Sequence, residues 1–278
     1  MRSSMKRRGW GARGFALVAV LWLGVALGLG AWSFLGKTRA AGYRLQAEIE
    51  TAHAEEIARS GLNLALGHLA TGRASVLRDG TPQLQALPGG QVRFRIWDEK
   101  GKADLNRSTP RLIAAALEGL EIRGFDALDY AGIADRLQAT ARRLKQGGNA
   151  VTLSAIFQSA QVPAALAARA SEVVTIHSFS NRINPWAAHP RLLASVPGLG
   201  QEGVEAILAA RREGERVPSL GTAEGWLTRA VGPAYSIEVV GTTASGVSAV
   251  MDAMVIADGR GFRSGRMRYL VLSARVRR

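Results

Sequence analysis

Residues 15–36 read FALVAVLWLGVALGLGAWSFLG, a run of 22 residues without a charged side chain. As an α-helix with a rise of about 1.5 Å per residue, this run is roughly 33 Å long, which is enough to cross a bilayer core of about 30 Å. A buried core helix is the alternative, but such a helix normally has a polar face, whereas apolar residues surround this one. The stretch therefore predicts a transmembrane helix over residues 15–36.

The segment before this run, residues 1–14, contains no acid and five cations: Arg2, Lys6, Arg7, Arg8 and Arg13. By the positive-inside rule, the N-terminus stays in the cytoplasm and the chain after the span is exported. A cleaved secretory signal is the alternative, but its apolar region is about 7 to 15 residues long and ends at a small-residue cleavage site. Because the run here is longer and meets Lys37-Thr38-Arg39, we expect the mature protein to keep it.

The junction at Gly14 and Phe15 resembles the processing site of type IV prepilins, in which a basic leader and a glycine precede a phenylalanine that opens a long apolar helix. The resemblance implies that prepilin peptidase cuts after Gly14 on the cytoplasmic face, and that Phe15 becomes the N-methylated mature N-terminus. The fifth mature residue is then Ala19, where pilin-like subunits normally have Glu.

The length, cysteine content and net charge limit the kinds of domain and site that the exported part can contain. A chain of 278 residues leaves room for one or two modest exported domains, and the absence of cysteine excludes disulfides, thiolate catalysis and cysteine-based metal sites. The net charge of +14 falls to +9 if the five leader cations are removed. Such a positive charge is compatible with binding to nucleic acid, with binding to anionic lipid headgroups, or with a role in solubility alone. The charge by itself does not distinguish these roles.

After the span, residues 37–73 have helical character and continue the N-terminal helix. Apolar residues at spacings of three and four form one stripe that we expect to pack on a domain: Leu45, Ile49, Ala52, Ala58, Leu62, Ala65 and Leu69. We interpret four acids as the solvated face of this helix, with a catalytic carboxylate pair as the alternative: Glu48, Glu50, Glu55 and Glu56.

The β signals come in two separated parts. Residues 91–98 alternate strictly, with Val92, Phe94 and Ile96 on one face, and so predict a half-buried strand. Residues 236–240, 248–257 and 266–276 predict hairpin strands, while the intervening residues have a helical period. Because a lone strand is not stable, the two β parts should pair, with the helices as an insertion. The predicted division is a leader at 1–14, the span at 15–36, its helical continuation at 37–73, two β parts at 74–105 and 233–278, and a helical subdomain at 106–232.

Residues 184–212 resemble a helix-hairpin-helix. Asn184 is the expected cap, Pro185 the first helical residue, and the turn at Gly198 and Gly200 joins two short helices. Such a turn can bind a phosphate or serve as a packing unit. We expect a structural turn and no nucleic-acid partner, because Arg211 and Arg212 lie at the far end of the second helix. With Gly203 the glycines spell G-x-G-x-x-G, but they follow a helix, so no dinucleotide site is predicted.

No catalytic motif is present: the chain has no G-x-S-x-G, no P-loop and no H-E-x-x-H. The histidines are dispersed without a partner at metal-ligand spacing: His53, His68, His177 and His189. We therefore predict no enzyme, no metal and no cofactor. Calcium is the alternative at Asp252, at Asp258 or at the group Asp98, Glu99 and Asp104, but the spacing of a calcium loop is missing, so we expect solvated turns.

Taken together, the chain resembles the general secretion pathway protein K family, minor pseudopilins of the type II secretion system. The resemblance rests on Arg13-Gly14-Phe15, on Asp98-Glu99-x-Gly101-Lys102-x-Asp104-Leu105-Asn106, on Ile176-His177-Ser178 and on Asn184-Pro185. It implies an α+β, pilin-like fold with a long N-terminal transmembrane helix, an antiparallel sheet and a large inserted all-helical subdomain. At residues 134–138 a basic helix replaces the acids that are usual in the family, so no family metal site is carried over there.

The resemblance also implies location and partners. The protein would be a single-pass protein of the bacterial inner membrane with its bulk in the periplasm, at the tip of a pseudopilus with the I- and J-type minor pseudopilins. The alternative is a membrane-anchored helix-hairpin-helix DNA receptor for competence. That alternative explains the basic charge, but it explains neither the two β parts nor the Gly14-Phe15 junction. A generic single-span scaffold explains little that is specific.

Overall fold

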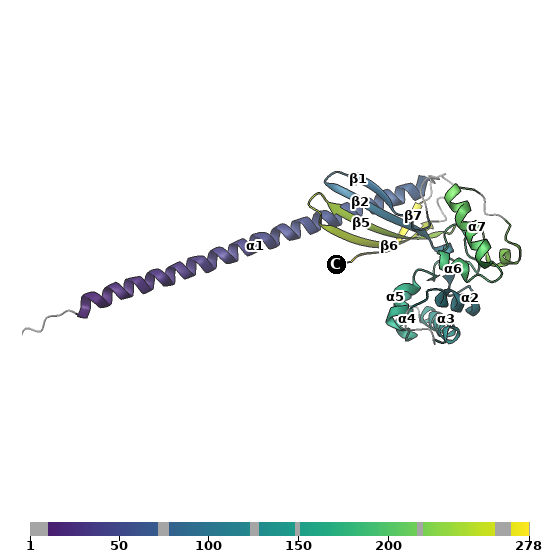
Figure 1. The fold of residues 1–278 in the computed structure, drawn as a ribbon, viewed down its shortest axis with the longest axis horizontal. Coiled ribbons are helices and arrows are strands. Elements are labelled where there is room, and N and C mark those ends of the chain that lie inside the picture. The colour runs from purple at the N-terminus through teal and green to yellow at the C-terminus, as the bar shows by residue number, and fades with distance from the viewer. Residues whose placement is uncertain are drawn as a thin grey trace, which may run out of the picture. The chain divides into compact units, whose positions relative to one another are not determined.

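The computed structural model describes residues 11–71, 78–122, 128–147, 151–215, 219–258 and 268–277 (Figure 1). Within the first helix, the side chains of residues 11–16, 30, 31 and 33–40 are outside this description. The chain divides into two compact units, Met1–His53 and Ala54–Arg278. The predicted leader falls largely on residues 1–10, which are not among the described residues.

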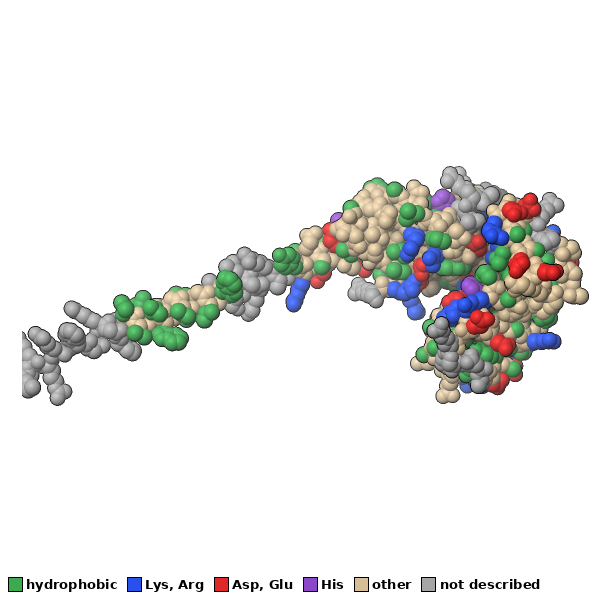
Figure 2. All heavy atoms as spheres, viewed as in Figure 1, with side chains coloured by type: hydrophobic (Ala, Val, Ile, Leu, Met, Phe, Trp, Pro, Cys, Tyr) green, Lys and Arg blue, Asp and Glu red, His purple; other side chains and the backbone are tan. Residues whose placement is uncertain are grey.

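The N-terminal helix α1 (Gly11–Thr71) is one continuous element of 61 residues, as the sequence predicted for residues 15–73. In the first unit its large apolar side chains are exposed; Leu17 is 72% exposed and Trp32 80% exposed. Figure 2 shows hydrophobic side chains gathered along this part of the helix. Among the described residues, no helix combines the length and the apolar character that crossing a membrane requires. The membrane span over residues 15–36 stays a prediction.

Five described strands of the second unit form an antiparallel sheet in the order β1-β2-β5-β6-β7. Their bounds are β1 Gln83–Leu87, β2 Gly90–Asp98, β5 Ala234–Thr243, β6 Ser248–Asp258 and β7 Arg268–Arg277. Strand β2 pairs with β5 in the register Phe94↔Val239, although more than a hundred residues separate them. The expected pairing of the two β parts is therefore confirmed, whereas β1 was not predicted. The α+β fold class is confirmed as well.

The last part of α1 packs on one face of this sheet (Figure 1). The buried contacts on the helix side are Ile57, Ala58, Leu62, Ala65 and Leu69, of which all but Ile57 belong to the predicted stripe. Leu45, Ile49 and Ala52, predicted to continue the stripe, are exposed. Two glycines allow the helix and the sheet to approach each other closely. A Cβ at Gly61 of α1 would lie 2.2 Å from Val92 Cγ2, and a Cβ at Gly241 of β5 would lie 2.6 Å from the Ala54 carbonyl oxygen.

Most of the elements described between β2 and β5 are helices, and their buried residues form a second hydrophobic cluster. Their bounds are α2 Pro110–Glu118, α3 Tyr130–Gln146, α4 Leu153–Ser159, α5 Ala164–Ala170, α6 Pro190–Ala194 and α7 Gly200–Glu213, with 3-10 helices η1 Glu99–Gly101 and η2 Gly221–Trp226. The side chains of Thr109, Asp129 and Thr152 cap α2, α3 and α4. A short parallel ladder joins β3 Ala103–Asp104 to β4 Val174–Thr175. The predicted subdomain boundaries stay predictions.

One helix start differs from the prediction. Helix α6 begins at Pro190 with His189 as its cap, and Pro185 is not helical. The physical reason is that the Asn184 side chain is used elsewhere: its Oδ1 accepts from Trp186 N at 3.0 Å and its Nδ2 donates to Asp98. The short α6 and the longer α7 then follow, joined through the glycine turn.

Candidate functional site

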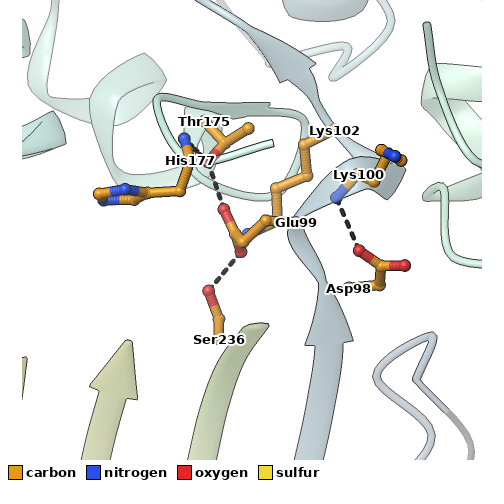
Figure 3. A network of polar contacts seen from close by, with 7 residues as sticks. All are labelled: Asp98, Glu99, Lys100, Lys102, Thr175, His177 and Ser236. Carbon is orange, nitrogen blue, oxygen red and sulfur yellow. Dashed lines mark hydrogen bonds and ion pairs between the residues drawn. The ribbon is translucent and has the colours of Figure 1, made fainter. Parts of the chain in front are cut away.

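A group of buried acids lies at the end of β2 and in the residues after it, where the sheet meets the helices. Three acids there, Asp98, Glu99 and Asp104, are 2%, 0% and 1% exposed, and we call them the acid cluster. Buried carboxylates are rare unless they are paired or hydrogen-bonded, because a desolvated charge is costly. Figure 3 shows Asp98 and Glu99 with their neighbours. The expectation of solvated turns at these three residues is wrong.

Glu99 in η1 is the most enclosed of the three. Its Oε1 pairs with Lys102 Nζ at 2.7 Å and accepts from the Ser236 hydroxyl of β5, while its Oε2 accepts from the Thr175 hydroxyl of β4 (Figure 3). Burial by itself raises the pKa of Glu99, but the Lys102 charge and the hydrogen bonds from Lys102, Ser236 and Thr175 together hold that pKa below its usual value. The charged carboxylate therefore ties β5 of the sheet to β4 of the helical insertion.

Asp98, the last residue of β2, makes a second tie. Its carboxylate accepts from Gly232 N at 2.9 Å, from Lys100 N at 2.9 Å and from Asn184 Nδ2 at 3.2 Å. Burial raises the pKa of Asp98, because the hydrogen bonds from Gly232, Lys100 and Asn184 offset only part of the desolvation. This residue thus joins the end of β2 both to the chain that enters β5 and to the segment before α6.

Asp104 in β3 makes the third tie, and both of its oxygens are used. Oδ1 accepts from Asn106 N at 2.8 Å, whereas Oδ2 accepts from Ser178 Oγ at 3.0 Å and from Phe179 N at 2.9 Å. The carboxylate therefore holds two loops at once, the one after β3 and the one after β4.

The three carboxylates take their hydrogen bonds from separate sets of donors, so they do not form an acid–base pair. Within the described ranges, no three His, Asp or Glu side chains are grouped so that they could hold a metal ion. A calcium ion at the acid cluster would have to replace the N–H and O–H donors that the carboxylates already accept from. Asp252 pairs with Arg277 at 2.6 Å, and the turn after Asp258 is outside the described residues.

The turn before α7 has two residues with positive φ, a conformation that favours glycine. Gly198 and Gly200 have φ of +78° and +64°, and a Cβ at Gly198 would lie 2.6 Å from Thr222 Oγ1. Arg211 is committed elsewhere, since its guanidinium donates to the carbonyl oxygens of Pro185 and Ala188. Burial lowers the pKa of Arg211 to about 10.

The other predicted residues do not share a site. His68 stacks on Phe94, His53 is exposed on α1, His189 caps α6, and His177 lies half-buried beside β4. Gly14 and Phe15 lie in α1, but their side chains are outside the described part.

Sequence reasoning named the acid cluster but missed its partners Thr175, Ser236 and Gly232. One signal was available: Asp98 continues the alternation of Val92, Phe94 and Ile96, which places it on the buried face of β2.

No family model matches the chain, and no curated protein matches it. Among solved structures, a chain in the crystal structure of the GspK–GspI–GspJ complex from the type 2 secretion system of enterotoxigenic Escherichia coli is similar to this one. The match covers 87% of this chain and 99% of that chain, with 15% sequence identity and a TM-score of 0.48. At this level of similarity, the function has to be inferred from this chain's own residues and geometry.

Proposed function

We propose that this protein is a minor pseudopilin of a type II secretion system, a structural subunit and not an enzyme. One observation carries the proposal: a single helix, α1, has an exposed apolar N-terminal part and buries its last turns on an antiparallel sheet. That sheet is interrupted between β2 and β5 by a helical insertion, and the acid cluster ties the two together. These features match what the sequence resemblance implies.

In this proposal α1 anchors the protein in the bacterial inner membrane, with the N-terminus in the cytoplasm and the second unit in the periplasm. Prepilin peptidase removes residues 1–14, and Phe15 is N-methylated. The exposed apolar residues between Leu17 and Leu29 support this role, because such a surface needs lipid or neighbouring helices to cover it.

We place this subunit at the tip of the pseudopilus, beside the I- and J-type minor pseudopilins. The fifth mature residue is Ala19, so the apolar stem has no carboxylate to accept the N-terminal amine of a subunit beyond it. A carboxylate costs about 2.5 to 3.5 kcal/mol at the centre of a span and less near the interface, so a subunit that pairs with no N-terminal amine gains by having Ala19 there. The bulky helical insertion would also obstruct close stacking if it were repeated at every step.

An epitope placed in the helical insertion tests the tip position directly. In cells that overproduce pseudopili, we expect immunogold label at one end of each fibre. Label spaced regularly along the shaft would exclude the tip position, and secretion lost with the gene but restored by the tagged chain would show that the tag is harmless.

The DNA-receptor alternative gains no support from the glycine turn. A phosphate there would need cations beside the turn, but the first turn of α7 carries Glu202, and Arg211 is occupied by Pro185 and Ala188. We therefore propose that Gly198 and Gly200 shape a structural turn.

A further inference from the structure

Phe179, in the loop after β4, combines two properties that oppose stability. Its side chain is 53% exposed, and its backbone has φ of +55°. A bulky residue in the left-handed region is an outlier, because its Cβ crowds the neighbouring carbonyl oxygen. Glycine or asparagine would adopt this conformation at much lower cost. An exposed ring gains little from burial, so packing within this chain does not explain the choice of residue.

Asp104 of the acid cluster binds the backbone at this residue. Asp104 accepts from Phe179 N at 2.9 Å and from Ser178 Oγ at 3.0 Å, and Ser178 Oγ also accepts from Ser180 N at 3.3 Å. Since Asp104 is 1% exposed, its carboxylate is a rigid anchor for the loop. The ring is therefore held outward by buried groups, and strain of this kind tends to occur at functional positions.

The two loops that Asp104 joins both carry exposed arginines. Asp104 also binds the loop after β3 through Asn106 N, and its carbonyl oxygen accepts from Arg107 N at 3.1 Å. Arg107 and Arg182 are both exposed, and the described residues 105–111 and 175–184 contain no acid. Aromatic residues and arginine, both of which are exposed on these two loops, are enriched in binding hot spots.

We propose that Phe179 anchors a protein–protein contact in which its ring enters an apolar pocket on a neighbouring subunit, and that carboxylates at the rim of this pocket face Arg107 and Arg182. This inference rests on the proposed function, since the neighbour is another subunit of the pseudopilus. Asp104 then has a second role besides holding two loops: its hydrogen bond to Phe179 N offsets part of the conformational cost of presenting the ring.

The test compares variants of the full chain in detergent, titrated with the purified I- and J-type minor pseudopilins of the same secretion system. Phe179→Gly removes both the ring and the strain. We expect its thermal midpoint to equal or exceed that of the wild type while its affinity for the probe falls about 30-fold, the effect typical of a hot spot. Phe179→Trp should keep most of the affinity, and Arg182→Glu should weaken it most at low salt.

Leu84→Ala is the matched control, because Leu84 is another exposed hydrophobic residue, 68% exposed on β1, and we expect its affinity to stay unchanged. If Phe179→Gly binds the probe as tightly as the wild type, the inference is overturned while the proposed function stands. If the wild type binds neither probe, the inference is overturned; if the chain also keeps Met1, the proposed function fails with it.

Discussion

Substituting Glu99→Gln keeps the shape of a fully buried side chain but removes its charge. Lys102, whose side chain is 12% exposed, then loses its partner at 2.7 Å. Removing one member of a buried ion pair costs about 3 to 5 kcal/mol, because the other charge stays buried without compensation. Against a total stability of about 5 to 15 kcal/mol, this is a large loss. Arg169 and Glu172 form the matched control, with the same spacing of three residues but with side chains 36% and 38% exposed. Glu172→Gln should cost less than about 1 kcal/mol.

Denaturant unfolding of the full chain in detergent measures both effects, followed by tryptophan fluorescence and by circular dichroism. Trp97 directly precedes Asp98 and gives a local signal. The double variant Glu99→Gln with Lys102→Met removes both charges, and we expect it to be more stable than Glu99→Gln alone. The reasoning is refuted if Glu99→Gln costs no more than Glu172→Gln, or if the two changes at 99 and 102 simply add.

The same variant has a defined pH dependence. The folded pKa of Glu99 lies below its usual value of 4.5, so its stabilising contribution is complete above pH 4.5 and is lost as the pH falls through the folded pKa. The stability gap between the wild type and Glu99→Gln should therefore narrow below pH 4.5. The contribution of Asp98 to stability changes with pH in the opposite direction. Because its folded pKa is above the usual 3.8, this contribution is present below pH 3.8 and is lost as the pH rises through the folded pKa.

Two further predictions concern glycines. Gly61→Ala should destabilise the protein by about 1 to 3 kcal/mol, because the new methyl group would clash with Val92 and Val239. Gly67→Ala is the control in the same helix: its methyl group would meet no atom within 4 Å, so we expect it to stabilise the protein by about 0.5 to 1 kcal/mol. Thermal unfolding measures both effects. The full chain should bind duplex DNA weakly in fluorescence anisotropy, with no further loss in Gly198→Ala. Tight, salt-sensitive binding abolished by that change would favour the competence receptor instead.

Much of the fold follows from patterns that are local in the sequence. The alternation of residues 91–98 locates β2, and the need of a strand for a partner predicts its pairing with β5. Strand β1 could not be predicted from its own sequence, QLQAL, because it has no β-branched or aromatic residue. It forms because it pairs with β2 across a tight turn.

The site was harder to predict because its partners are distant in sequence. Thr175 and Ser236 lie 76 and 137 residues from Glu99, and no local pattern connects a hydroxyl to a carboxylate at such separations. The burial of Asp98 was available from the period of β2, but acids beside a Gly-Lys turn were interpreted as solvated. Helix α6 begins at Pro190 because Asn184 is held by Asp98, a long-range contact that outweighs a plausible local cap.

The central claim, that this chain is a pilin-like subunit of a secretion system, is tested most directly by the mature N-terminus. Mass spectrometry of the protein purified from its own membranes should find a chain that begins at N-methylated Phe15 and retains the apolar stem. A chain that keeps Met1, or one that starts beyond Gly36, would contradict the claim.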